Sequence, residues 1–177
     1  MDRILCFLLG LLCFSSLYAA PMASSLEPVP AALSKLEYLT KKKPDLKADY
    51  YIFLKSASWC GPCRMVMPKI AKEYRKLRRG KVELVLIACE PPDEAKEYLE
   101  HYKAKFAGTA QIQSGTLPGV SFSSGGIPSM CLVDAQGNKL YDGHGSQVLE
   151  WKELIKEDQA EKKKAAREAK KTRSDPD

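Results

Sequence analysis

Two apolar runs on either side of an amphipathic helix constrain the fold of this 177-residue chain most strongly. The first run, DYYIFLKSAS at residues 49–58, is apolar, aromatic and β-branched, which is the composition of a buried strand. KVELVLIAC at residues 81–89 repeats that composition. Between them apolar residues recur at helical spacing as far as Arg79, and Gly80 closes the helix. This order predicts two parallel strands joined by a crossover helix.

Further elements on both sides of this unit complete an α/β domain. Residues 31–43 place leucines at helical spacing, and residues 91–106 predict a second amphipathic helix. Residues 107–126 show no sustained period and predict a long loop, a kind of segment that is often functional. Residues 127–143 predict a hairpin around the turn DAQG. The expected fold class is α/β, with a mixed central β-sheet flanked by helices on both faces.

The two ends of the chain differ from this domain, which we place at residues 31–156. Residues 1–20 carry a basic residue, an apolar run and then small residues, the pattern of a secretory signal peptide. The run is short for a membrane span of about 20 apolar residues, so an uncleaved anchor is the less favoured interpretation. Residues 21–30 predict a flexible leader, and residues 157–177 a charged tail that is helical or disordered. We expect a periplasmic or secreted protein with no stable membrane insertion after cleavage.

The charge pattern does not indicate a nucleic-acid partner. The chain has 28 basic and 22 acidic side chains, a formal net charge of +6. Most of these charges alternate in sign along the chain, whereas a nucleic-acid-binding face requires clustered basic residues.

A last helix, marked by Val148, Trp151 and Ile155, precedes the charged tail. We expect a monomer.

Two cysteines, Cys60 and Cys63, stand where the first strand ends and its helix begins. The unpaired N–H groups and the positive dipole of a helix N-terminus stabilise a thiolate, so the pKa of the first thiol falls below its usual value of about 8.5. The second thiol lies one helical turn on, where it can attack the same sulfur. This spacing predicts a redox pair in which Cys60 is the nucleophile and Cys63 the resolving thiol.

The neighbouring residues fit that interpretation. Gly61 permits a tight corner between strand and helix, Pro62 is tolerated in the first helical turn, and Arg64 adds positive charge. A structural zinc site would require two more ligands, and the only histidines, His101 and His144, are not in ligand-pair spacing. A purely structural disulfide over so short a loop would constrain the unfolded chain little. Both remain as minor alternatives, and we expect neither a metal nor a bound cofactor.

The motif WCGPC, from Trp59 to Cys63, resembles the active site of the thioredoxin-like family. The resemblance covers roughly residues 45–156 and extends to Pro68 in the helix and to the segment GGIPSMCLV around Pro128. The lead-in SASWCGPCR looks most like tryparedoxins and exported thioredoxin-like disulfide reductases. The resemblance implies a thioredoxin fold and a flat contact surface at Trp59. It also implies a cis peptide between Ile127 and Pro128, with the backbone of Ile127 binding an extended substrate segment.

One residue departs from the family pattern. Thioredoxins have a buried aspartate six residues before the first cysteine, where it assists proton transfer from the resolving cysteine, and this chain has Leu54 there. Three ionisable residues could replace it, and the sequence does not rank them: Lys55, Glu83 and Glu90.

The other cysteines of the domain, Cys89 and Cys131, fall on separate strands. In the sheet order that the resemblance implies, these strands lie on opposite sides of the first strand, about 9.6 Å apart. That distance exceeds the limit of about 7 Å for Cα atoms in a disulfide, so we expect two free thiols. Both are interpreted as small buried hydrophobic residues, with Cys89 the better candidate for a regulatory thiol.

These features predict an exported thiol–disulfide oxidoreductase that reduces or isomerises protein disulfides. Its expected partners are proteins that carry disulfides and a second protein that donates electrons. Two alternatives remain. The first is an oxidant that introduces disulfides, and the second is a binding or holdase module that uses the groove beside the cis-proline.

Overall fold

The computed structural model describes residues 27–113 and 115–174. The predicted signal peptide and most of the leader lie outside the described residues. The described elements, in chain order, are α1 (Val29–Ser34), β1 (Tyr50–Ser56), α2 (Gly61–Arg79), β2 (Val82–Ala88), α3 (Pro92–His101), β3 (Ala107–Thr109), β4 (Ser129–Asp134), β5 (Lys139–His144), a 3-10 helix (Gly145–Glu150) and α4 (Trp151–Ser174).

The strands form one mixed sheet in the order β3-β2-β1-β4-β5. β2 runs parallel to both β1 and β3, and β4 is antiparallel to β1 and β5. At the centre of the sheet, Phe53 of β1 lies between Val85 of β2 and Cys131 of β4. The expected crossover unit, the hairpin and the mixed α/β sheet are therefore confirmed.

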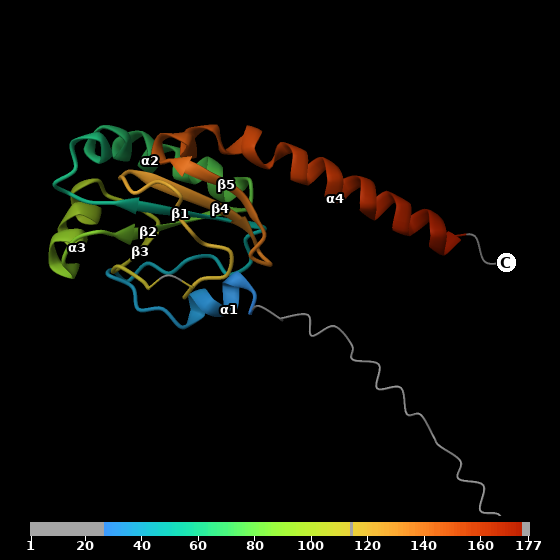
Figure 1. Cartoon of the computed structure of the whole chain (residues 1–177), viewed down its shortest axis with the longest axis horizontal. Helices are drawn as coiled ribbons and strands as arrows, with labels where there is room; N and C mark the ends of the chain where they lie inside the picture. Colours follow the sequence, from blue (N-terminus) through green and yellow to red (C-terminus); the bar gives the residue numbers. More distant parts are fainter. Residues whose placement is uncertain (1–26, 114, 175–177) are drawn as a thin grey trace, which may run out of the picture.

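Side chains alternate between two cores, one on each face of the sheet. Tyr50, Ile52 and Leu54 of β1 pack with α2, α3 and the start of α4. Tyr51 and Phe53 point the other way and pack with α1 and the loops beside it. Figure 1 shows α2 and α1 on opposite sides of the sheet. One face is thus covered by long helices, and the other mainly by loops and one short helix.

The first helix differs from its prediction, which extended over residues 31–43. α1 begins at Val29, because Pro30 is well placed in a first helical turn, and it ends at Ser34. Beyond it the chain bonds to other elements, since the N–H of Leu39 donates to Gly108 at 2.8 Å. A tertiary hydrogen bond with the edge of the sheet therefore overrides the helical spacing of the leucines.

Two other boundaries also differ. The helix predicted over residues 91–106 ends at His101, and Lys103 has a φ of 49°, a left-handed conformation that does not continue a helix. The segment predicted as a loop from residue 107 begins with β3, whose three residues pair with Val85, Leu86 and Ile87. Three residues are too few to show the alternation by which a strand is recognised.

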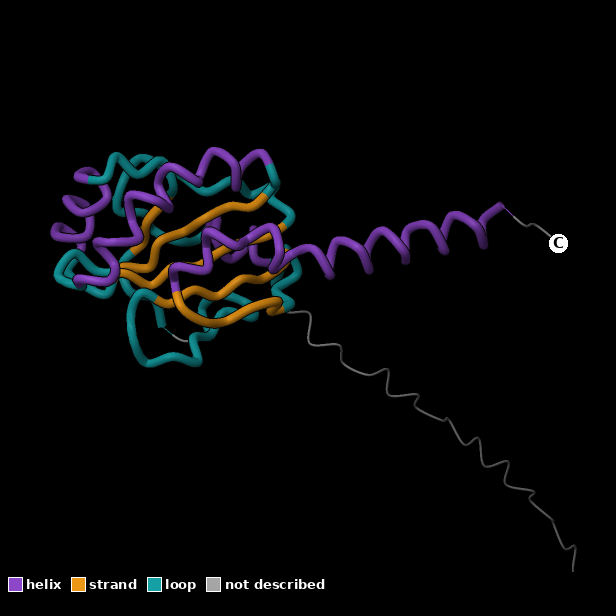
Figure 2. Tube along the Cα trace, turned by 90° about the horizontal axis from the view of Figure 1, so that it is seen from above, coloured by secondary structure: helices purple, strands orange, loops and turns teal. Residues whose placement is uncertain are grey.

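α4 is long and leaves the body of the domain, as both views show (Figure 1, Figure 2). Its first turns are anchored: Asp158 accepts a hydrogen bond from the Tyr50 hydroxyl at 2.6 Å, and Lys162 pairs with Asp134 at 3.2 Å. Farther along the sequence lacks large apolar residues, so the helix has nothing to bury. Most of the segment predicted as helical or disordered is thus helical, to Ser174.

Candidate active site

Cys60 and Cys63 form a disulfide at the start of α2. Cys60 is the N-cap residue, and its sulfur accepts a hydrogen bond from the N–H of Cys63 at 3.2 Å. The first turn of α2 contains no acidic side chain, while Lys76, Arg78 and Arg79 occupy its last turn, where cations suit the helix dipole. The same N–H and the positive end of α2 would stabilise a thiolate on Cys60 after reduction.

The two sulfur-bearing residues differ in access. Cys60 is 5% exposed, whereas Cys63 is fully buried, so an incoming disulfide reaches Cys60 first. Trp59 is 65% exposed and Met65 70% exposed, which puts a large apolar surface beside Cys60. Arg64 is exposed in the same turn. This surface can contact a protein substrate without covering the reactive sulfur.

The loop before β4 lies against the disulfide. The peptide bond between Ile127 and Pro128 is cis, and the Ile127 carbonyl oxygen lies 3.5 Å from the Cys60 sulfur. Within the described part of the chain, the Ile127 N–H has no hydrogen-bond acceptor. An N–H left free beside the reactive sulfur is the group that an extended substrate segment requires.

Gly145, which the sequence analysis did not single out, holds this loop in place. Its N–H donates to the Pro128 carbonyl at 2.9 Å. A Cβ added at Gly145 would lie 2.6 Å from the Pro128 Cβ and 2.9 Å from the Leu54 Cδ1, so a larger residue would displace the proline. In the sequence, the only sign of this role is a glycine just after the predicted hairpin. That sign could not be interpreted without knowing that β5 ends beside Pro128.

Gly61 is the first residue of α2, at the corner between β1 and that helix. Its φ is not positive, and a Cβ added there would meet no other atom within 4 Å. The corner between strand and helix therefore does not require glycine. Pro62 does lie in the first turn of α2, as expected, and Pro68 lies inside the helix.

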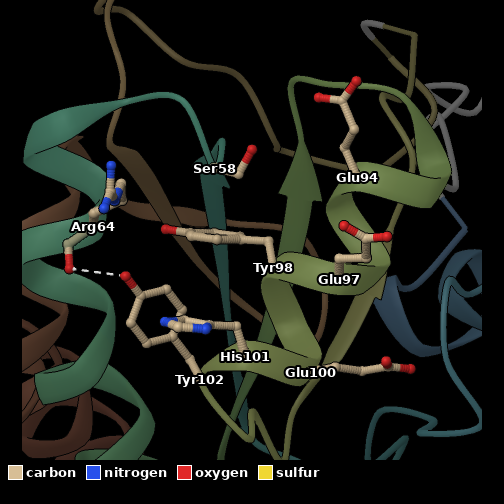
Figure 3. Close-up of a pocket in the computed structure, with 8 residues that line it drawn as sticks. All are labelled: Ser58, Arg64, Glu94, Glu97, Tyr98, Glu100, His101 and Tyr102. Carbon is tan, nitrogen blue, oxygen red and sulfur yellow. Dashed lines mark hydrogen bonds between the residues drawn. The ribbon is translucent and has the colours of Figure 1, made fainter.

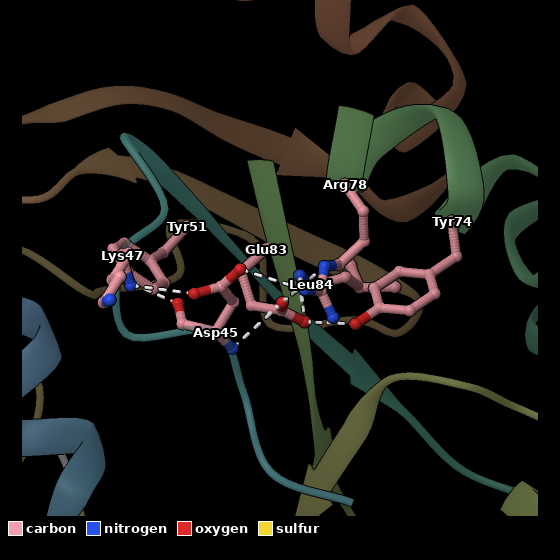
Figure 4. Close-up of polar contacts among 7 residues, drawn as sticks. All are labelled: Asp45, Lys47, Tyr51, Tyr74, Arg78, Glu83 and Leu84. Atoms are coloured by element: carbon pink, nitrogen blue, oxygen red, sulfur yellow. Dashed lines mark hydrogen bonds and ion pairs between the residues drawn. The ribbon is translucent and has the colours of Figure 1, made fainter. Parts of the chain in front are cut away.

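Of the three groups that could replace the missing aspartate, Glu83 lies at the wrong end of its strand. It is the second residue of β2, whereas the cysteines lie beyond the carboxyl end of β1, which runs parallel to β2. Its carboxylate accepts hydrogen bonds from the Tyr74 hydroxyl at 2.7 Å and the Asp45 N–H at 3.1 Å, beside Arg78 (Figure 4). Burial raises the pKa of Glu83, and these hydrogen bonds oppose the rise. Glu83 is a structural residue.

Lys55 lies on the wrong face. It alternates with Leu54 along β1, and Leu54 is fully buried in the core that contains α2. The Lys55 ammonium lies on the other face, 5.2 Å from the centre of the Phe122 ring. It belongs to a separate pocket.

Glu90 lies at the active-site end of β2. It is 8% exposed, and one carboxylate oxygen accepts hydrogen bonds from the N–H of Ser58 at 2.8 Å and from its hydroxyl at 2.5 Å. The other oxygen, Oε1, is buried without a hydrogen-bond partner among the described residues. Because Ser58 is two residues before Cys60, these hydrogen bonds connect Glu90 to the active-site loop. The oxygen Oε1 remains available to accept a further hydrogen bond or a proton.

The remaining two cysteines of the domain are free thiols, as expected. Cys131 is fully buried in β4. Cys89 is half-buried and packs against the small cluster that contains Cys60 and Cys63. Burial raises the pKa of both thiols. Cys89 thus contacts the active-site cluster as a thiol that is a weak nucleophile at neutral pH.

A cleft of about 520 Å³ separates the start of α2 from α3 (Figure 3). Ser58 and Arg64 line one side, and the exposed side of α3 lines the other, where the Tyr102 hydroxyl donates to the Arg64 carbonyl at 3.4 Å. The α3 side carries the carboxylates of Glu94, Glu97 and Glu100. The cleft opens beside the active-site loop, since Ser58 belongs to both.

Residues 27–113 and 115–174 contain no group of three or more His, Cys, Asp or Glu side chains that could hold a metal ion. No helix in the same residues is long and apolar enough to cross a membrane.

Comparisons with known proteins agree with this fold. The chain is 26% identical over 150 residues to the thiol-disulfide oxidoreductase ResA of Bacillus cereus, covering 83% of this chain and 86% of that protein. It is 27% identical over 107 residues to the ResA of Bacillus thuringiensis, covering 60% and 61% of the two chains.

Among solved structures, a thioredoxin-like protein from Aeropyrum pernix superimposes with a TM-score of 0.51 at 16% identity, covering 63% of this chain and 78% of that one. This likeness shows a shared thioredoxin fold. The family model described as AhpC/TSA matches residues 30–138, which include the cysteine pair and the cis-proline. The chain therefore belongs to the AhpC/TSA family of thioredoxin-like proteins.

Proposed function

We propose that this protein reduces or isomerises disulfides in other proteins, with Cys60 as the nucleophile and Cys63 as the resolving thiol. The chain is a thioredoxin-like thiol–disulfide oxidoreductase by family and by its cysteine pair. One observation carries the proposal: the accessible sulfur of the pair caps the N-terminus of α2, while its partner is buried behind it. That arrangement suits attack by one thiolate and release by the other.

The reaction begins with the reduced protein. The Cys60 thiolate attacks one sulfur of the substrate disulfide, a bond forms between the two sulfurs, and the substrate bond breaks. Cys63 then loses its proton and attacks Cys60, which releases the second substrate thiolate. Two electrons have passed to the substrate, both of its thiolates take up protons, and the protein is left with the disulfide seen in the structure.

Glu90 is our proposed acceptor for the Cys63 proton. Its Oε1 is buried and has no hydrogen-bond donor among the described residues, so it can bind a proton without first breaking a contact. Ser58 holds the other oxygen beside the active-site loop. In this proposal Glu90, which follows the neighbouring strand β2, takes the role of the aspartate that is missing at Leu54.

The substrate segment would lie across Trp59 and pair with the backbone of Ile127. The free N–H of Ile127 supports this placement, because main-chain pairing accepts many substrate sequences. The exposed side chains of Trp59 and Met65 would supply apolar contact to the substrate.

Reduction of insulin disulfides tests the proposal. We expect activity in the wild type and its loss in Cys60→Ser and Cys63→Ser. Cys63→Ser should also retain a covalent complex with a disulfide substrate, visible by mass spectrometry, while Cys60→Ser should retain none. Undiminished activity in both variants would contradict the redox proposal and favour a binding or holdase module.

A redox titration against glutathione tests the direction. Thioredoxin-type reductases lie near about −270 mV, and a strong oxidant near about −120 mV. The Gly-Pro spacer and Ile127 before the cis-proline both resemble the reductases, so we expect a low potential. A value above about −150 mV would assign the protein to the oxidants.

We also propose that the protein is exported, as a periplasmic or secreted monomer that receives electrons from a second protein. The apolar leader in residues 1–20 supports export. Amino-terminal sequencing of the protein from fractionated cells should find it processed near residue 20 and outside the cytoplasm. An unprocessed cytoplasmic protein would refute the export proposal without affecting the redox one.

A further inference from the structure

A second pocket lies on the sheet face opposite α2, beneath the loop between β3 and β4. Its volume is about 320 Å³, at the small end of the range for ligand pockets. Its walls are aliphatic and its rim polar, with amides from Gln111 and Gln113. The walls are formed by Ile87, Ile112, Leu117 and Val120.

A single cation, Lys55, lines this pocket from the central strand of the sheet. The residues next to it in the two neighbouring strands are Ile87 and Ser129, both buried. Lys55 is only half-buried, but a central strand is still an unusual place for an ammonium group, because partial burial of a charge is costly without an opposite charge.

No such opposite charge is present among the described residues. The ammonium of Lys55 lies over the Phe122 ring at 5.2 Å and forms no ion pair there. An ion pair is present at the pocket rim, where Lys139 pairs with Asp142 at 3.3 Å and donates a hydrogen bond to Ser121. The hydroxyl of Ser129, directly opposite Lys55 in the sheet, is buried and also lacks a partner.

We propose that this pocket binds a small amphiphilic monocarboxylate. The carboxylate would pair with the Lys55 ammonium, and the apolar body would lie against the aliphatic walls and the Phe122 ring. Charge complementarity supports an anion, because the pocket offers one unpaired cation and no carboxylate. The volume of about 320 Å³ suits a small molecule of about the size of octanoate. The pocket lies on the face of β1 opposite Leu54 and α2.

Titration of the oxidised full chain with octanoate, and with octanamide as its neutral analogue, tests the inference. We expect saturable binding of octanoate in calorimetry and shifts of the backbone amide signals of residues 111–113 and 117–122 in NMR spectra. Octanoate should bind about tenfold more tightly than octanamide, because a charge-assisted hydrogen bond is lost in the amide.

Four variants separate charge from shape. Lys55→Met should bind octanoate about tenfold more weakly and octanamide as well as the wild type does, whereas Lys55→Arg should keep the preference. Val120→Trp should fill the pocket and abolish binding of both, a test that holds even if Lys55→Met fails to fold. Lys69→Met, on the exposed side of α2, is the matched control and should bind like the wild type. Equal affinity for the two ligands, or a preference that survives in Lys55→Met, would overturn the inference.

Discussion

Two buried glutamates lie at opposite ends of β2 and differ in how their oxygens are used. Both oxygens of Glu83 accept hydrogen bonds, from Tyr74, Leu84 and Asp45, and Arg78 lies nearby. Glu90 uses one oxygen for Ser58, and its other oxygen is buried without a partner in the described part of the chain. We therefore assign Glu83 to the stability of the fold, and Glu90, which is bonded to Ser58 of the active-site loop, remains the proposed proton acceptor.

The largest effect should follow removal of Glu83. Glu83→Ala leaves the Tyr74 hydroxyl, the Asp45 N–H and Arg78 without their shared partner, so we expect a loss of about 3–5 kcal/mol in the free energy of unfolding. Urea unfolding at pH 7 measures it. Glu90→Ala should lose only about 1–2 kcal/mol, since it removes the two bonds from Ser58. Equal losses of unfolding free energy in Glu83→Ala and Glu90→Ala would contradict the proposed difference between a structural Glu83 and a catalytic Glu90.

The next effect concerns catalysis. Glu90→Gln keeps the size of the side chain but cannot accept the Cys63 proton, so release of the substrate from the mixed disulfide should slow by about 100-fold at neutral pH. Rapid quenching and mass spectrometry of a single turnover measure that step.

Glu83→Gln is the matched control for this step. It should release the mixed disulfide within about twofold of the wild-type rate, since Glu83 lies at the far end of the strand. Slow release in Glu83→Gln together with normal release in Glu90→Gln would reverse the two assignments.

The pH dependence of stability distinguishes the glutamates further. Burial raises the pKa of Glu83 above its unfolded value of about 4.3. The folded protein therefore resists ionisation of Glu83. The part of its contribution to stability that depends on protonation is full below pH 4 and is lost as the pH rises through the folded pKa, while the hydrogen bonds to the carboxylate remain. The stability of the wild type relative to Glu83→Gln should fall over that range, by up to about 1.4 kcal/mol per pH unit.

Urea unfolding of the wild type and Glu83→Gln, in steps from pH 4 to pH 7, checks this sign. A stability difference that grows with pH would mean that the hydrogen bonds and Arg78 outweigh burial, and that the pKa of Glu83 is lowered in the folded protein.

The position of the reactive pair could be predicted from the sequence because its determinants are local. A buried run ending before Cys60 and an amphipathic helix beginning after it place the thiols at a helix N-terminus, whatever the rest of the chain does. The choice between Glu83 and Glu90, by contrast, follows from the strand pairing that the structure supplies. Parallel strands end at the same edge of a sheet, so the acid after residue 88 lies near the cysteines and the acid at the start of the strand does not.

Other features depend on contacts between distant segments. The end of α1 is set by a bond from Leu39 to Gly108, and β3 is too short to show a period. Gly145 matters only because the end of β5 meets Pro128. The pocket at Lys55 exists only because the loop after β3 folds over that face of the sheet. None of these contacts leaves a periodic signal in the sequence.

The smallest expected effect concerns Cys89, the residue before Glu90. Burial raises the pKa of the Cys89 thiol, the charge of Glu90 raises it further, and Lys55 opposes the rise. Glu90→Gln removes a negative charge, so the pKa of Cys89 should fall and its alkylation by iodoacetamide at pH 8 should become a few-fold faster. The oxidised protein suits this measurement because Cys60 and Cys63 are then blocked and Cys131 is fully buried. Glu83→Gln should leave the rate unchanged. If both variants alkylate at the wild-type rate, the Glu90 carboxylate does not bear its charge beside Cys89, and its role as proton acceptor at the active-site end of β2 loses support.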